Sequence, residues 1–114
     1  MVIYVKSSTS DTRLICTMDM FTPTEREDHI QSTTQLYQSV QSIREVENGY
    51  EFSFPNETDF ISRIAEFIAR ERLCCPFLKF TLNVVSNSEP VSLSLIGPVG
   101  TQEFLRAEFG GAVV

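Results

Sequence analysis

The chain has few positive charges and no long apolar run. Only 9 of its 114 residues are Lys or Arg, against 15 Asp or Glu, so its formal net charge is −6. Without a basic patch to neutralise phosphates, binding to nucleic acid is disfavoured, and an anionic membrane surface repels the chain. No segment approaches the about 20 apolar residues that span a bilayer, and the N-terminus lacks the pattern of a signal peptide. We therefore predict a cytoplasmic protein that binds neither nucleic acid nor membrane.

Motifs of common enzyme classes are also missing. The sequence has one His, no Trp, and no glycine-rich phosphate loop, nucleophile elbow or His-x-x-x-His pair. Its three cysteines are an odd number, which suits reduced thiols in the cytosol better than a secreted disulfide framework. A length of 114 residues with 42% hydrophobic residues suffices for one domain, 1–114, whose core needs no metal or disulfide to hold it together.

Hydrophobic periodicity predicts alternating strands and amphipathic helices. Strand-like alternation covers residues 14–20, part of 44–54, 78–84 and 91–95, and helical spacing covers 23–42, 57–75 and 101–109. Thr22 and Glu25 form a capping box at the first helix, Asn48-Gly49 favours a hairpin turn, and Asn56 is placed to cap the second helix. Residues 1–12 contain either an edge strand or a mobile tail.

These elements predict an α+β fold. Strands that alternate in polarity form a sheet with one dry face, and each helix has one apolar stripe to place on it. We expect a two-layer sandwich with a mainly antiparallel sheet and helices packed on one face.

Two adjacent cysteines, Cys74 and Cys75, precede Pro76 at the predicted end of the second helix. Proline disfavours helical geometry at the residue before it, so Cys74 should lie in the last turn and Cys75 at the boundary. Neighbouring helical residues point about 100° apart, so we expect one of the two thiols to be accessible.

The first functional hypothesis is a soft-metal or metalloid site formed by Cys16, Cys74, Cys75 and Glu71. Thiolates select thiophilic ions such as zinc over hard cations. Glu71 lies three residues before Cys74 and four before Cys75, so it shares their side of the helix and could supply an oxygen ligand. The alternative for Glu71 is a solvated helix charge. His29, the only histidine, is predicted at a boundary or on the surface, and a role as a base or ligand is the alternative.

Two other hypotheses remain open, and neither assigns catalytic or cofactor-binding residues. In one, the cysteines only pack, and the protein is a non-catalytic interaction module that forms a homodimer through an exposed sheet face rich in Phe and Tyr. In the other, it is a thiol redox enzyme. The negative end of a helix dipole should raise a thiol pKa, which disfavours an enzyme. A disulfide between Cys74 and Cys75 would be strained, so Cys16 is the better oxidation partner.

The chain resembles a group of small, largely uncharacterised bacterial proteins with a Glu-x-x-Cys-Cys-Pro-Phe-Leu-x-Phe signature, present here from Glu71 to Phe80. The similarity extends over most of the chain from about residue 15, and Phe67 is the candidate for an aromatic position in the helix before the cysteines. Its other carriers are Cys16-Thr17, Gly49-Tyr50, Phe52, Phe54-Pro55, Gly97-Pro98, Gly100 and Phe104-Leu105. The resemblance implies that Cys16, Cys74 and Cys75 belong to one constellation that handles a metal or metalloid.

Overall fold

The computed structural model describes residues 2–6, 13–17 and 21–110, and only the backbone of the first two segments. Strands β1 (Val2–Lys6) and β2 (Arg13–Thr17) pair as an antiparallel two-stranded sheet. Of the two alternatives for residues 1–12, an edge strand or a mobile tail, Val2–Lys6 form a strand, and β2 matches part of the strand expected for 14–20. Residues 7–12 and 18–20 lie outside the described part.

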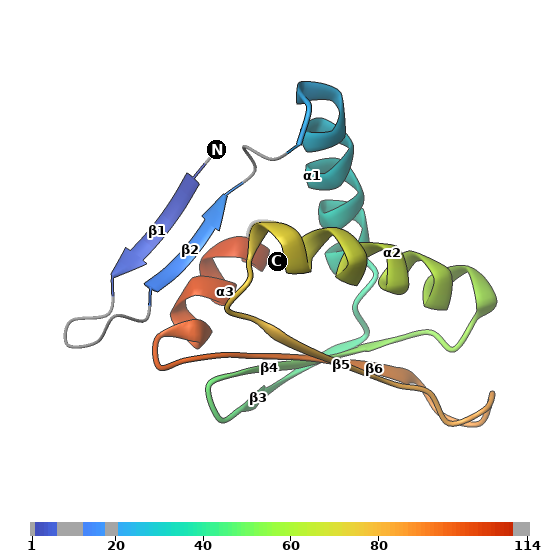
Figure 1. The fold of residues 1–114 in the computed structure, drawn as a ribbon. Helices are drawn as coiled ribbons and strands as arrows, with labels where there is room; N and C mark the ends of the chain where they lie inside the picture. The colour runs from blue at the N-terminus through green and yellow to red at the C-terminus, as the bar shows by residue number, and fades with distance from the viewer. Residues whose placement is uncertain (1, 7–12, 18–20, 111–114) are drawn as a thin grey trace.

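A four-stranded antiparallel sheet and three helices make up the rest of the described chain. Its sheet has the strand order β3-β4-β6-β5, and α1, α2 and α3 lie on one side of it (Figure 1). The α+β prediction, with helices on one sheet face, is confirmed. The elements are α1 (Pro23–Gln38), β3 (Ser42–Val46), β4 (Gly49–Phe54), α2 (Thr58–Cys74), β5 (Lys79–Asn83), β6 (Val91–Ile96) and α3 (Thr101–Phe109).

Among the described residues, no helix combines the length and apolar character needed to cross a bilayer.

The start of α1 is as predicted, and its end is earlier. Glu25 N–H donates to Thr22 Oγ1 at 3.1 Å, and Thr22 N–H donates to Glu25 Oε1 at 2.8 Å, which completes the capping box. The helix ends at Gln38 rather than near residue 42. Gln41 N–H donates to Ser53 O at 2.8 Å, so the chain already follows the edge of β4 at that point.

The hairpin between β3 and β4 turns one residue earlier than the Asn48-Gly49 dipeptide predicts. Val46 pairs with Gly49, so the loop residues are Glu47 and Asn48, and Asn48 has a φ of 59°. Gly49 instead lies against β6, where an added Cβ would be 1.9 Å from Leu95 O. Glycine is therefore required at position 49 by the close approach of two strands rather than by the turn.

Asn56 does not cap α2, and its side chain instead forms hydrogen bonds with a turn that is distant in the sequence. The N-cap residue is Glu57, whose side chain makes no capping bond. The Asn56 amide donates to Ser86 O at 2.6 Å and to Glu89 O at 2.8 Å, both in the turn between β5 and β6. The capping prediction is wrong: a cap would use Oδ1 as an acceptor at the start of α2, whereas the N-cap position is Glu57 and the Asn56 side chain directs its Nδ2 to carbonyls about thirty residues away.

We expect Asn56→Ala to lower the free energy of unfolding by about 1 kcal/mol, since it removes two hydrogen bonds at a partly exposed site. Urea unfolding monitored by circular dichroism measures the loss. Asn83→Ala, an exposed position in β5, is the matched control and should change stability by less than half as much. Equal losses in the two variants would show that the Asn56 amide bonds contribute no net stability.

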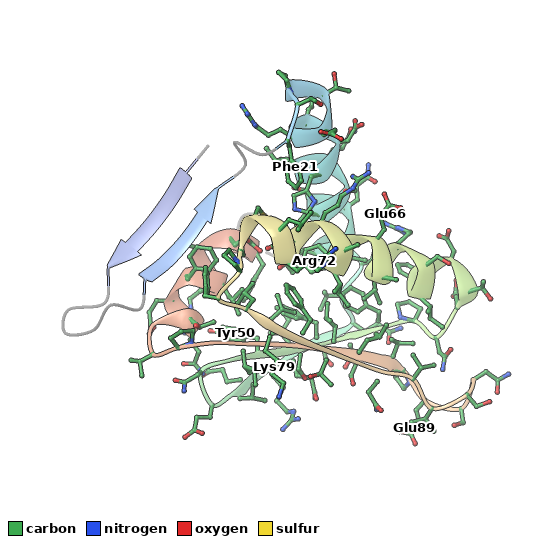
Figure 2. The ribbon with its side chains drawn as sticks, in the orientation of Figure 1. Phe21, Tyr50, Glu66, Arg72, Lys79 and Glu89 are labelled. Atoms are coloured by element: carbon green, nitrogen blue, oxygen red, sulfur yellow. The ribbon has the colours of Figure 1, made fainter. Side chains whose placement is uncertain are left out.

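Aromatic side chains fill the space between helices and sheet (Figure 2). The rings of Phe52 and Phe109 lie 5.5 and 5.9 Å from Tyr37, which places the Tyr37 hydroxyl at the junction of α1 and α3. The prediction of a Phe- and Tyr-rich exposed sheet face is wrong, because the described aromatics of the sheet point toward the helices. Residues of the opposite face include Arg44, Glu51, Ser53, Lys79, Thr81, Ser92 and Ser94.

Candidate functional site

Both cysteines of the Cys-Cys-Pro corner are buried. Helix α2 ends at Cys74, and Cys75 is its C-cap, whose N–H donates to Glu71 O at 2.7 Å, as the proline predicts. However, the two side chains are each 0% exposed, so the prediction of one accessible thiol is wrong. Cys75 has a φ of −126° and a ψ of 72°, and outside helical geometry the 100° separation of neighbouring side chains no longer applies.

Glu71 points into the protein and is 2% exposed, so its interpretation as a solvated helix charge is wrong. It shares the inner stripe of α2 with Ile64, Phe67 and Cys74, which are spaced three and four residues apart. Glu71 therefore occupies a core position, where a carboxylate requires hydrogen-bond partners.

His29 is 1% exposed, which contradicts its predicted boundary or surface position. The inner stripe of α1 contains His29, Leu36 and Tyr37, whereas Ile30, expected on that stripe, is 44% exposed. Leu36 and Tyr37 lie on the stripe as their spacing predicts, and His29 rather than Ile30 is its first buried residue. As a result, His29 Nε2 lies 2.9 Å from Glu71 Oε1, and this contact joins α1 to α2.

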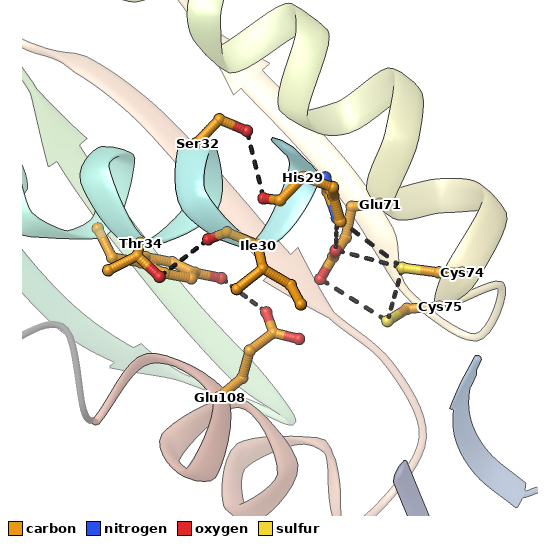
Figure 3. Close-up of polar contacts among 9 residues, drawn as sticks. His29, Ile30, Ser32, Thr34, Glu71, Cys74, Cys75 and Glu108 are labelled. Carbon is orange, nitrogen blue, oxygen red and sulfur yellow. Dashed lines mark hydrogen bonds and ion pairs between the residues drawn. The ribbon is translucent and has the colours of Figure 1, made fainter. Parts of the chain in front are cut away.

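Cys74 completes a buried triad with these two residues (Figure 3). Its Sγ lies 3.5 Å from Glu71 Oε1 and 4.0 Å from His29 Nε2. Imidazole nitrogen, carboxylate oxygen and thiolate sulfur are the three ligand types that proteins use for Zn²⁺. A tetrahedral zinc with bonds of about 2.0–2.3 Å separates its ligand atoms by about 3.3–3.8 Å, and the triad distances of 2.9, 3.5 and 4.0 Å bracket that range.

The second oxygen of Glu71 faces another group of possible ligands. Cys75 Sγ lies 3.7 Å from Glu71 Oε2, and a carboxylate oxygen of Glu108, on α3, lies within 4.8 Å of ligand atoms of both residues. Tyr37 Oη donates to Glu108 Oε1 at 3.0 Å. Glu108 was not among the sequence candidates, although Thr101, Leu105 and Glu108 follow helical spacing along the buried side of α3.

The protons of this cluster can be assigned from its hydrogen bonds. Burial and the neighbouring Glu71 charge raise the pKa of Glu108 well above its usual value, and its hydrogen bond with Glu71 raises it further. The same bond lowers the pKa of Glu71, although burial raises it overall. We therefore assign the proton to Glu108, and Glu71 is the carboxylate that accepts hydrogen bonds from His29 and Cys74.

The neutral form of His29 is favoured by burial. Burial lowers its pKa, and Nε2 is the ring atom that contacts Glu71. His29 Nδ1 is buried with no hydrogen-bond partner among the described residues. A proton on Nε2 leaves only a lone pair unmet at Nδ1, whereas a proton on Nδ1 leaves a buried donor unmet. The Nε2–H tautomer is therefore favoured.

The two sulfurs differ in chemical state. Cys74 retains its thiol, whose pKa is raised strongly by burial and by the Glu71 charge. Cys75 is disulfide-bonded, and its Sγ lies 3.7 Å from Cys74 Sγ. The structure thus brings together Glu71, Cys74 and Cys75 of the four predicted ligands. The Cys16 side chain lies outside the described residues, although its backbone pairs with Ile3 in the β1–β2 sheet.

Comparisons with known proteins add no further assignment. No protein-family model, curated protein or solved structure matches this chain. The geometry of the buried cluster is therefore the basis for a functional proposal.

Proposed function

We propose that this protein binds one thiophilic divalent cation, of the zinc type, through His29 Nε2, the Glu71 carboxylate and Cys74 Sγ. The observation that carries the proposal is the convergence of these three ligand atoms from two helices, all within 4.8 Å of one another. The hypothesis drawn from the sequence placed Cys74 and Glu71 in such a site, and the proposal adds His29 to them.

The charges around the triad support a cation. The described side chains that contact Glu71 are His29, Cys74, Cys75 and Glu108, and only the imidazole among them can carry positive charge. Burial raises the pKa of Cys74, so its thiolate is unfavourable there unless a positive charge arrives. A bound Zn²⁺ would supply that charge, and the thiol proton of Cys74 would be released to solvent. His29 would bind through Nε2 and carry its proton on Nδ1.

The same features disfavour a thiol enzyme. A catalytic thiol must be accessible and partly ionised near neutral pH. Cys74 is fully buried, and its pKa is raised rather than lowered. Three protein ligands leave one position of a tetrahedral ion open, a count that zinc enzymes share, so it is the burial of all three residues that favours a site that holds an ion. We therefore propose a non-catalytic, metal-holding protein, and we retain the cytoplasmic location as part of this proposal.

Zn²⁺ titration of the chelator-stripped, reduced protein tests the site. We expect about one equivalent to bind in competition with a chromophoric chelator, and Cys74→Ser, Glu71→Gln and His29→Ala each to weaken binding by more than about tenfold. Loss of even an outer partner of a metal ligand costs about 10–100-fold, and a direct ligand contributes at least as much.

Glu66→Gln provides the matched control for Glu71→Gln. Glu66 lies on the same helix and is exposed, so removing its charge should leave the affinity within about twofold. Circular dichroism verifies that each variant is folded before its affinity is measured. The proposal is wrong if the wild-type protein binds no Zn²⁺, or if the three triad variants bind it as tightly as the wild type.

A further inference from the structure

Cys75 lies where a fourth ligand of the proposed ion is needed. Its Sγ is 3.7 Å from Cys74 Sγ and 3.7 Å from Glu71 Oε2. Two thiolates bound to one tetrahedral zinc are separated by about 3.7–3.8 Å, as bonds of about 2.3 Å require. The two sulfurs thus have the spacing of neighbouring ligands on a single ion, next to the oxygen that Glu71 does not direct at His29.

The disulfide removes Cys75 from the ligand set. Metal ions bind the thiolate, and a sulfur in a disulfide has no proton to lose and no thiolate form. We propose that reduction of the Cys75 disulfide adds Cys75 as a fourth ligand, so that the redox state of this cysteine sets the affinity for thiophilic cations. This inference rests on the proposed function, because it concerns the ion held by His29, Glu71 and Cys74.

A dithiol can act as the reductant of the Cys75 disulfide. The dithiol supplies two electrons and two protons and becomes a cyclic disulfide, while the protein S–S bond breaks and leaves two cysteine thiols. Binding of Zn²⁺ then displaces one proton each from Cys74 and Cys75 to solvent. In the reverse direction, a small-molecule disulfide accepts the two electrons, re-forms the protein S–S bond and removes one of the four ligands.

Reduction also changes which ions the site prefers. With Cys75 in a disulfide, the donors are one sulfur, one nitrogen and one oxygen, and after reduction there are two thiolates. Added thiolate character selects soft and borderline ions over hard ions such as Mg²⁺. In a compartment buffered by thiols, the four-ligand state is the resting one, and an oxidant acts as the signal for release.

The test compares Zn²⁺ affinity in the two redox states of the wild-type protein. One sample is reduced with a dithiol that is then removed by gel filtration in oxygen-free buffer, because free dithiols bind zinc. The other is oxidised with a small-molecule disulfide. We expect the reduced protein to bind Zn²⁺ at least about tenfold more tightly, the cost of losing one direct ligand.

Variants at two cysteines test whether the redox effect arises from the Cys75 disulfide. Cys16 is the remaining cysteine of the chain, so peptide mapping of the oxidised protein should recover a Cys16–Cys75 pair. Cys16→Ser should then bind Zn²⁺ tightly under both conditions. Cys75→Ser and the smaller Cys75→Ala should bind it weakly under both, and circular dichroism checks that they fold.

The two proposals fail in different ways. If the wild type binds one Zn²⁺ equally tightly in both redox states, the fourth-ligand inference is wrong, while the three-ligand site stands. If Cys75→Ser binds as tightly as the reduced wild type, the inference is also wrong. If the wild type binds no Zn²⁺ in either state, the site itself is wrong.

Discussion

Zn²⁺ at about 100 times its dissociation constant is expected to raise the unfolding temperature of the reduced protein by about 10 °C. A ligand that binds only the folded state at this excess adds about 2.7 kcal/mol, and for a domain of this size each kcal/mol shifts the midpoint by about 4 °C. The physical basis is a bridge between helices, since His29 is on α1 while Glu71 and Cys74 are on α2. Differential scanning calorimetry with and without Zn²⁺ measures the shift.

Ligand variants distinguish this site from weak binding elsewhere on an acidic protein. Cys74→Ala should lose most of the Zn²⁺-dependent shift, whereas the exposed control Glu66→Gln should retain it. Mg²⁺ should produce little shift in any of them, because it prefers oxygen ligands and keeps several of its waters. A Zn²⁺ shift of equal size in Cys74→Ala and the wild type would place the bound ion outside the triad.

Sequence periodicity predicted the α+β fold because the spacing of apolar residues within one strand or helix shows which of its faces is buried. Phe52 and Phe54 alternate with polar residues, and the inner stripe of α2 is apolar except at Glu71, so their inner faces follow from spacing alone. The errors arose at residues whose role depends on a contact with a residue far away in the sequence. Gly49 is constrained by Leu95, and Asn56 by the carbonyls of the β5–β6 turn, and no local pattern encodes either contact.

The candidate site was only partly accessible to sequence analysis. Glu71, Cys74 and Cys75 converge because they lie three and four residues apart, a relation that is fixed within one helix. His29 and Glu108 come from other helices, and polar residues on an apolar stripe resemble surface residues when the phase of the stripe is wrong. Leu36 lies seven residues after His29, about two helical turns, so extending the stripe back from Leu36 by that spacing would have placed His29 in the core.

Glu108→Gln is expected to stabilise the metal-free protein at pH 8 by more than about 1 kcal/mol. Burial and the Glu71 carboxylate hold the pKa of Glu108 well above its usual value, and each unit of such a shift corresponds to about 1.4 kcal/mol. Glutamine keeps an oxygen that accepts from Tyr37 and an amide that donates to Glu71. At pH 8 the folded wild type must either keep a proton on Glu108 or place a second negative charge beside Glu71, and both cost free energy. The glutamine variant avoids both costs.

The pH dependence of this gain follows from proton binding. Above the unfolded carboxyl pKa of about 4.3, the unfolded chain releases the Glu108 proton while the folded protein retains it. Raising the pH through that window therefore destabilises the folded wild type, and the variant lacks this contribution. Tyr37 and His29 also face Glu108, and both lower its pKa, against the larger effects of burial and Glu71. The stabilisation by Glu108→Gln should thus be near zero at pH 4 and largest at pH 8.

His29 contributes a pH dependence of opposite sign. Burial lowers its pKa, so between the folded value and about 6.5 the unfolded chain binds more protons, and stability rises with pH. Glu108 raises the pKa of His29, so the His29 contribution differs between the two proteins below pH 6.5. The difference between variant and wild type at pH 8, where His29 is largely neutral in both the folded and the unfolded chain, therefore isolates Glu108. Urea unfolding in chelator at pH 4, 6 and 8 measures that difference, with the exposed Glu27→Gln as the control for losing one negative charge. If the increase in the free energy of unfolding were the same at all three pH values, or the same in Glu27→Gln, Glu108 would not be the protonated member of the cluster.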